Sequence, residues 1–257
     1  MTDVMRKRIA RDRRPAVGFE TVVERVPFLR ALTPADRDRL RPYAEVRHVE
    51  SGHAVWKLDD ALHAYVFLVS GHVKLMRPCD TGREVMLDVT GPGNLLCASA
   101  VSAFSPACCT TVALGDDVVV LLLPRRDVLH IVEQSPAAAM AFVRETTTRE
   151  MRLAGRIAEL ASGQVEQRVA ALLLDLAGRE DAVRENGRTR IPLHLSRQDL
   201  ADLCGTTLET AIRTMSRLAR EDVVATAASG FVIVDRPALE RLARGERNRL
   251  GAQSPRN

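Results

Sequence analysis

Between residues 195 and 218, apolar side chains recur every three or four positions in two short segments. This spacing predicts two amphipathic helices that each turn one face toward a core. Gly205 lies between the segments and is expected to end the first helix, because glycine adopts a left-handed conformation without steric cost. The predicted core positions are Leu200, Ala201, Leu203 and Cys204 in the first helix and Ala211, Met215 and Leu218 in the second.

Polar residues at the two predicted helix starts support this assignment. Ser196 and Asp199 have the spacing of a capping box, and Thr206 or Thr207 can cap the second helix. Residues 223–234 then predict a β-hairpin with a short turn. Two helices joined by a tight turn and followed by a hairpin are typical of a winged helix-turn-helix, which indicates sequence-specific binding of double-stranded DNA.

The face of the second helix opposite its core suits base recognition. Arg213 can donate two hydrogen bonds to guanine, Glu209 can accept one from cytosine, and Ile212 can contact a thymine methyl group. The expected contacts with the DNA backbone come from Ser196, Arg197, Thr207 and Ser216. The alternative is a helical hairpin in an ordinary domain, with Glu209 and Arg213 forming a surface ion pair.

The first half of the chain has a different pattern. Val22–Val46 predicts two short helical pieces, and residues 46–124 then form short apolar runs that glycines separate. Many short strands with glycine turns favour a jelly roll or a related barrel, and the run Val118–Leu123 predicts a strand buried on both faces. The expected strands are 46–49, 54–57, 64–70, 73–77, 85–89, 95–98, 108–113 and 118–124, with Gly52, Gly71, Gly82 and Gly93 between them.

A long helix is predicted over residues 135–162. It carries a narrow apolar stripe made of Met140, Val143, Thr147, Met151, Ala154, Ala158 and Ala161. The stripe fits packing against the barrel of the same chain or pairing with a second copy. Pairing is favoured, because two-fold DNA sites need two recognition helices about 34–36 Å apart. Gly163 is a candidate hinge before another helix over residues 164–176.

Composition narrows the functional class only slightly. The net charge of +4 and the pI of about 9.0 are compatible with nucleic-acid binding but do not require it. No apolar run is long enough to cross a bilayer and the basic N-terminus lacks the apolar stretch of a signal peptide, so a cytoplasmic location is expected. Residues 1–18 and 246–257 are expected to be disordered tails. No catalytic pair, phosphate loop or metal motif is found, so an enzyme is not expected.

The layout resembles the CRP/FNR family of bacterial transcription regulators. Three segments carry the resemblance: VFLVSGHVKLMRPCDTGREVMLDVTGPGNLL from Val66, LSRQDLADLCGTTLETAIRTMSRL from Leu195, and GFVIVDRPALERLA from Gly230. The resemblance implies an α+β fold with a cyclic-nucleotide-binding-like β jelly roll (residues 19–134), a dimerisation helix and hinge (135–163) and a winged helix-turn-helix (164–245). It also implies a homodimer on palindromic promoter sites, with RNA polymerase as a further partner.

Within the second helix the family motif often reads (S/T)-x-E-T-x-x-R, which Thr207, Glu209, Thr210 and Arg213 match. Position 208 is leucine where the CRP type usually has arginine. Ile212 replaces the serine that is usual in the FNR type. The resemblance therefore implies a half-site that keeps the G·C pair read by Glu209 and Arg213.

The family's cyclic AMP site is altered in this chain. Members that bind cyclic AMP carry a G-E pair and an R-S pair, and the matching positions here are Cys97-Ala98 and Cys108-Cys109. Because burying a phosphate without a cationic partner is costly, cyclic AMP is not expected to bind in the usual way. What remains is a degenerate effector pocket made of Cys97, Ala98, Ser99, Cys108 and Cys109, for an apolar or other unidentified effector, or for none.

No cofactor or metal is expected. The five cysteines form no CxxC pair and match no cluster spacing, so a zinc or iron–sulfur site is not predicted, and Cys204 is expected in the core. Cys108 and Cys109 invite a redox interpretation, but adjacent strand residues point to opposite faces, so one of them should be buried. A haem sensor is the alternative, although no signature surrounds its candidate ligands His48, His53, His63, His72, His130 and Cys97.

Overall fold

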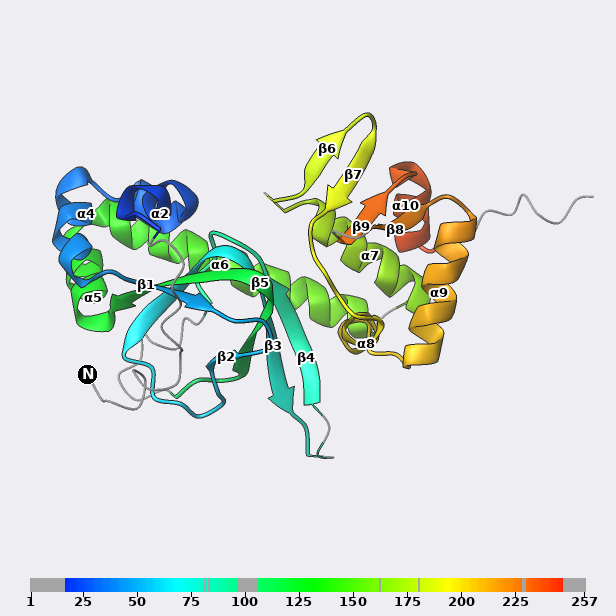
Figure 1. Ribbon diagram of the computed structural model, residues 1–257, viewed down its shortest axis with the longest axis horizontal. Helices are drawn as coiled ribbons and strands as arrows, with labels where there is room; N and C mark the ends of the chain where they lie inside the picture. Colours follow the sequence, from blue (N-terminus) through cyan, green and yellow to red (C-terminus); the bar gives the residue numbers. More distant parts are fainter. Residues whose placement is uncertain are drawn as a thin grey trace, which may run out of the picture. The chain divides into compact units, whose positions relative to one another are not determined.

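The computed structural model describes residues 17–80, 82, 84–96, 106–161, 163–179, 181–227 and 230–246. The chain divides into two compact units, Met1–Ala154 and Gly155–Asn257, each with antiparallel strands and helices (Figure 1). The predicted α+β class is confirmed. Residues 1–16 and 247–257 of the expected tails 1–18 and 246–257 lie outside the described residues, as do three pocket residues, Cys97, Ala98 and Ser99.

The first unit is built around one antiparallel sheet. Its strands have the order β1-β5-β3-β4, and β2 also pairs with β5. In chain order its elements are α2 (Phe19–Arg25), α3 (Pro27–Ala31), α4 (Pro34–Leu40), the 3-10 helix η1 (Arg41–Tyr43), β1 (Glu45–Val49), β2 (Ala54–Trp56), β3 (Ala64–Pro78), β4 (Glu84–Thr90), β5 (Thr110–Pro124), α5 (Arg125–Gln134) and α6 (Pro136–Ala161). The last turns of α6 belong to the second unit.

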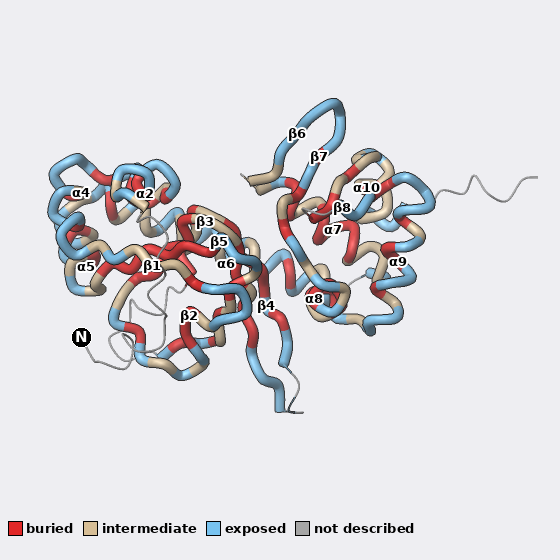
Figure 2. The backbone as a smooth tube through the Cα atoms, in the orientation of Figure 1, coloured by how far each residue is buried: buried red, intermediate tan, exposed pale blue. Residues whose placement is uncertain are grey.

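The core of this unit lies along β3 and β5. All six residues of the run Val118–Leu123 are at most 5% exposed, which confirms the prediction of a strand buried on both faces. Figure 2 shows this burial along both strands. Aromatic contacts hold two flanking helices against β3. Phe28 of α3 stacks on Phe67 with the ring centroids 5.4 Å apart, and Phe142 of α6 packs edge-on against Tyr65 with the centroids 5.4 Å apart.

The predicted strands 46–49, 54–57 and 85–89 are confirmed as β1, β2 and β4, but four other predicted strands were divided wrongly. β3 covers two predicted strands, 64–70 and 73–77, and β5 covers most of 108–113 and all of 118–124. Gly71 was expected to mark a turn, but it lies inside β3 at φ 75°, within the second of two shifts of the β3–β5 register. A side chain there would approach Asp117 O at 2.8 Å, so the glycine permits a bend and a close strand contact rather than a chain reversal.

Two further elements differ from the prediction. The expected strand 95–98 is reduced, within its described residues, to one bridge between Leu95 and Phe67. The helix α5 was not predicted. It follows β5 directly, has only Val128 and Ile131 fully buried, and has no side-chain cap at its N-terminus, so its local sequence signal is weak.

The second unit combines helices with a four-stranded sheet in the order β6-β7-β9-β8. Its elements are α7 (Val165–Ala177), β6 (Val183–Glu185), β7 (Arg188–Ile191), α8 (Arg197–Leu203), α9 (Leu208–Arg220), β8 (Val224–Ala227), β9 (Gly230–Ile233) and α10 (Arg236–Ala243). The hairpin β8–β9 confirms the predicted one. The hairpin β6–β7 was missed, although Asn186-Gly187 at its turn is a strong hairpin signal and both residues have positive φ.

Candidate nucleic-acid interface

The two helices α8 and α9 are fixed by local hydrogen bonds at their starts. Ser196 Oγ accepts from Asp199 N at 3.0 Å, while Asp199 Oδ2 accepts from Ser196 N at 3.1 Å, so the predicted capping box is present. Thr207 Oγ1 accepts from Thr210 N at 3.3 Å and caps α9. Gly205 has φ 56° after the end of α8, as predicted from its place between the helices.

One face of α9 is buried and the other is exposed. Ala211, Met215 and Leu218 are at most 3% exposed, as predicted, and Thr214 joins them. An ion pair between Arg217 and Glu166 of α7 holds the helix to the rest of the unit. The opposite face, which is pale blue along α9 in Figure 2, carries Leu208, Glu209, Ile212, Arg213 and Ser216.

The exposed face presents the groups that the sequence assigned to base contacts. Within the described part of the chain, Glu209 and Arg213 form no ion pair with each other, so the alternative of a surface ion pair finds no support there. Ile212 is 44% exposed and Leu208 is 42% exposed, an unusual position for two large apolar side chains. A carboxylate, a guanidinium and two apolar groups thus point away from the core of this unit on one helix face.

The residues expected to contact the DNA backbone are partly engaged within the chain. The Ser196 hydroxyl donates to Asp199 Oδ2 at 2.6 Å, and the Thr207 hydroxyl donates to Thr210 Oγ1 at 2.9 Å. Arg197 donates to Thr226 Oγ1 of β8 at 3.1 Å, which brings the hairpin strand to the start of α8. Thr226 was not predicted, because this contact joins residues 29 positions apart. Backbone contacts by these side chains stay predictions.

The degenerate pocket is only partly described. Cys109 is buried and Cys108 is exposed, in line with the expectation that one of the two would be buried. Their sulfur atoms are 4.0 Å apart, about twice the length of a disulfide bond. The Cys109 carbonyl accepts from Trp56 Nε1 at 2.9 Å, and the Cys108 carbonyl accepts from Arg77 at 3.3 Å. The guanidinium of Arg77 beside this segment was not predicted.

The candidate haem ligands are scattered over separate elements. His48 lies on β1, His72 on β3 and His130 on α5, while His53 and His63 are exposed between strands. Among the described residues, no group of three or more histidine, cysteine or acidic side chains has the arrangement of a metal site. Haem binding stays untested. Cys204 lies in the core as predicted, and burial raises the pKa of its thiol to about 12.

The long helix α6 has two different faces. The predicted stripe is exposed, with Met140 at 53%, Val143 at 52% and Met151 at 71%. The opposite face carries polar residues at steps of four, three and four, namely Glu145, Arg149, Arg152 and Arg156. This second periodicity was not predicted.

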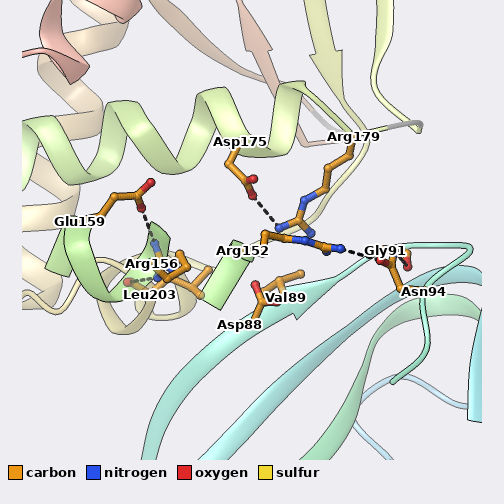
Figure 3. Close-up of polar contacts among 10 residues, drawn as sticks. All are labelled: Asp88, Val89, Gly91, Asn94, Arg152, Arg156, Glu159, Asp175, Arg179 and Leu203. Atoms are coloured by element: carbon orange, nitrogen blue, oxygen red, sulfur yellow. Dashed lines mark hydrogen bonds and ion pairs between the residues drawn. The ribbon is translucent and has the colours of Figure 1, made fainter. Parts of the chain in front are cut away.

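Three of these polar residues hold residues 94–96, in the first part of the β4–β5 connection. Leu95 N donates to Glu145 Oε1 at 2.8 Å, and Arg149 donates to Leu95 O at 3.1 Å and also to Leu96 O. Arg152 donates to Asn94 Oδ1 at 2.8 Å (Figure 3). In the first unit, α6 therefore holds the chain directly before the segment that contains Cys97, Ala98 and Ser99.

Comparison with known proteins agrees with this architecture. Residues 46–135 match the cyclic nucleotide-binding domain, and residues 167–242 match the Crp-like helix-turn-helix domain. The described residues contain no helix that is long and apolar enough to cross a membrane.

The chain is 30% identical over 198 residues to the transcriptional regulatory protein btr of Bordetella pertussis, which covers 76% of this chain and 79% of that protein. It is 28% identical to the transcriptional activatory protein AadR of Rhodopseudomonas palustris over 82% of this chain and 87% of that one. The structure of FixK2 from Bradyrhizobium japonicum superposes with a TM-score of 0.68 at 20% identity, over 77% of this chain and 96% of that chain. The chain belongs to the CRP/FNR family of transcription regulators.

Proposed function

We propose that this regulator acts as a homodimer on two-fold-symmetric promoter sites and reads a G·C pair in each half-site with Glu209 and Arg213. The observation that carries the proposal is the exposed face of α9, where both side chains stand opposite a buried Ala211 and Met215. A carboxylate that accepts from cytosine and a guanidinium that donates to guanine are matched to the two bases of one pair.

Apolar and backbone contacts complete the proposed interface. Ile212, exposed beside Arg213, contacts a thymine methyl group in the major groove. Arg197 and Ser216 meet phosphates, with Ser196 and Thr207 at the two helix starts, where backbone N–H groups favour anions. The site of action is then chromosomal DNA in the cytoplasm, with RNA polymerase as the partner through which transcription changes, and no enzymatic activity is involved.

The proposed dimer forms through the exposed stripe of α6. A helix face with Met140, Val143 and Met151 more than half exposed is a poor solvent-facing surface but a suitable seam for a second copy of the same helix. Two-fold pairing also gives two recognition helices, which a palindromic site requires.

We further propose that the regulator does not use cyclic AMP in the family's usual way and needs no cofactor. Cys108 and Cys109 occupy positions where cyclic-AMP-binding members carry arginine and serine. A visible absorption spectrum of the purified protein, before and after addition of haem, tests the haem alternative. A Soret band that persists after gel filtration would overturn the cofactor-free proposal.

The test of base reading starts with selection of bound sequences from a random duplex library. Fluorescence anisotropy then compares the selected site with a scrambled duplex for the wild type and for Arg213→Ala. Loss of one bidentate contact costs roughly 1–3 kcal/mol at each half-site, so the preference for the selected site should be lost. Arg126→Ala, which removes an exposed arginine from α5, is the matched control and should keep the preference. Full preference retained in Arg213→Ala would refute the assignment.

A further inference from the structure

The last turns of α6 belong to the DNA-binding unit and contact the turn between α8 and α9. Arg156 is only 7% exposed although it carries a full charge. Its guanidinium donates to the carbonyl of Leu203, the last residue of α8, and lies 3.4 Å from Glu159 Oε2 (Figure 3). A buried guanidinium is stable only when it is paired and hydrogen-bonded, so the burial of Arg156 depends on its contacts with Leu203 O and Glu159.

A second arginine reaches the same turn from α7. Arg168 Nε donates to Cys204 O at 2.8 Å, and another of its nitrogens lies 3.4 Å from Gly205 O. The same guanidinium donates to Gly163 O at 3.1 Å, at the glycine before α7. Arg168 therefore joins the start of α7 to the turn that precedes the recognition helix.

Together the two arginines bind the carbonyls of three consecutive residues, Leu203, Cys204 and Gly205. The last carbonyls of a helix lack partners within it, and cationic donors are favourable there. Only residues 206 and 207 separate this turn from the start of α9. A shift of the turn would therefore shift Glu209, which lies in the first turn of α9.

Packing leaves this turn little freedom. A side-chain carbon at Gly205 would lie 3.2 Å from Leu160 Cδ2, so α6 also contacts the turn through an apolar group. Cys204 is completely buried, and both arginines act on its thiol electrostatically. The accessibility of the Cys204 thiol therefore reports whether the α8–α9 turn keeps its packed position.

We propose that Arg156 and Arg168 form an arginine clamp that positions the α8–α9 turn, and that the C-terminal end of α6 thereby sets the placement of the recognition helix on DNA. Arg156 is a positioning residue in this proposal and touches no nucleotide. The inference rests on the proposed base reading by α9. Its effect on the α8–α9 turn can also be measured in the protein without DNA.

The first experiment measures DNA binding by full-length Arg156→Met, Arg156→Lys and the control Arg126→Met. Methionine keeps the apolar stem of the arginine and removes its donors, whereas lysine keeps one charged donor for Leu203 O. We expect Arg156→Met to bind the selected site about tenfold more weakly, the size of a lost charge-assisted hydrogen bond. Binding to a scrambled duplex should not change, because that binding depends on phosphate contacts alone. Arg156→Lys should recover part of the affinity, and Arg126→Met should match the wild type.

The second experiment measures the alkylation rate of Cys204 by mass spectrometry, without DNA, at a temperature where circular dichroism shows every variant folded. Removing the Arg156 charge makes the thiol harder to ionise, because Arg156 lowers its pKa. Faster alkylation in Arg156→Met therefore cannot come from easier ionisation of the thiol and reports greater exposure of Cys204. We expect at least a fivefold faster reaction than in the wild type and in Arg126→Met.

The outcomes separate this proposal from the proposed function. If Cys204 in Arg156→Met is alkylated as slowly as in the wild type, the clamp proposal is overturned, whatever the DNA result. An equal loss of affinity for the selected and scrambled duplexes would also overturn it, because that pattern shows a general loss of the interface. Failure of the wild type to select any sequence would overturn base reading instead, and the alkylation result would still decide the clamp.

Discussion

At the residue scale, Cys204 shows how one small side chain reports on its surroundings. It completes the core of the helix-turn-helix, with no exposed surface. Burial raises the pKa of its thiol from the ordinary value of 9.0 to about 12, against the opposing effect of Arg156 and Arg168. The folded state therefore holds the proton of this thiol in a pH range where the unfolded chain releases it.

This difference predicts an alkaline loss of stability that belongs to Cys204. Between pH 9 and 12 the unfolded state binds fewer protons than the folded state, so the free energy of unfolding falls as pH rises. The decline attributable to this thiol is about 1.4 kcal/mol per pH unit. Urea unfolding at several pH values should show a shallower decline for Cys204→Ala than for the wild type. The control Cys79→Ala, at an exposed position, should follow the wild type. Equal slopes for wild type and Cys204→Ala would contradict the assignment.

At the element scale, the sequence predicted what short-range patterns determine. The capping box at Ser196, the glycine at 205 and the buried face of α9 all depend on neighbours within four residues, and all three were predicted correctly. The strands β3 and β5 were divided wrongly, because a glycine such as Gly71 in β3 or Gly115 in β5 bends a strand as readily as it ends one. The clamp was missed for a related reason, since Arg156 and Leu203 are 47 positions apart.

The helix α6 contains one face that was predicted and one whose contacts were missed. Its exposed stripe was predicted from spacing, whereas the polar face at Glu145, Arg149 and Arg152 has the same helical spacing but polar chemistry. Polar side chains at helical spacing are usually solvated. Only the structure shows that these reach the backbone and side chain of residues 94–96.

The stripe predicts the effect of one charge on assembly. In a two-fold dimer each residue of the seam occurs twice, so Met151→Glu removes two apolar contacts and adds two facing carboxylates. Loss of roughly 1.5–3 kcal/mol per buried methionine weakens the dimer by about 100-fold or more. Sedimentation equilibrium should show the variant as a monomer at concentrations where the wild type is a dimer. Leu87→Glu places the same charge on an exposed apolar side chain of β4 and should leave the dimer intact. A dimeric Met151→Glu would remove the stripe from the interface.

At the scale of the whole molecule, each unit makes its own hydrogen bonds to its part of α6. Glu145 and Arg149 bind the chain at Leu95 and Leu96 in the first unit, and Arg156 binds Leu203 in the second. An effector changes DNA affinity only if it binds the DNA-competent and DNA-incompetent forms with different free energies.

Cyclic AMP is predicted to leave DNA binding unchanged, because cysteines stand where its cyclic phosphate would need an arginine. Anisotropy with the selected duplex should give the same Kd with saturating cyclic AMP, with 5′-AMP as the control nucleotide, and with neither. Calorimetry should show no heat of binding for either nucleotide. A fivefold or larger gain in affinity with cyclic AMP, the lower end of typical allosteric coupling of about 5–150-fold, would contradict the prediction. In that case the exposed Arg77, which donates to Cys108 O at 3.3 Å, is the cation to test. Loss of that gain in Arg77→Ala would show that the barrel had moved its phosphate-binding charge from the usual position to β3.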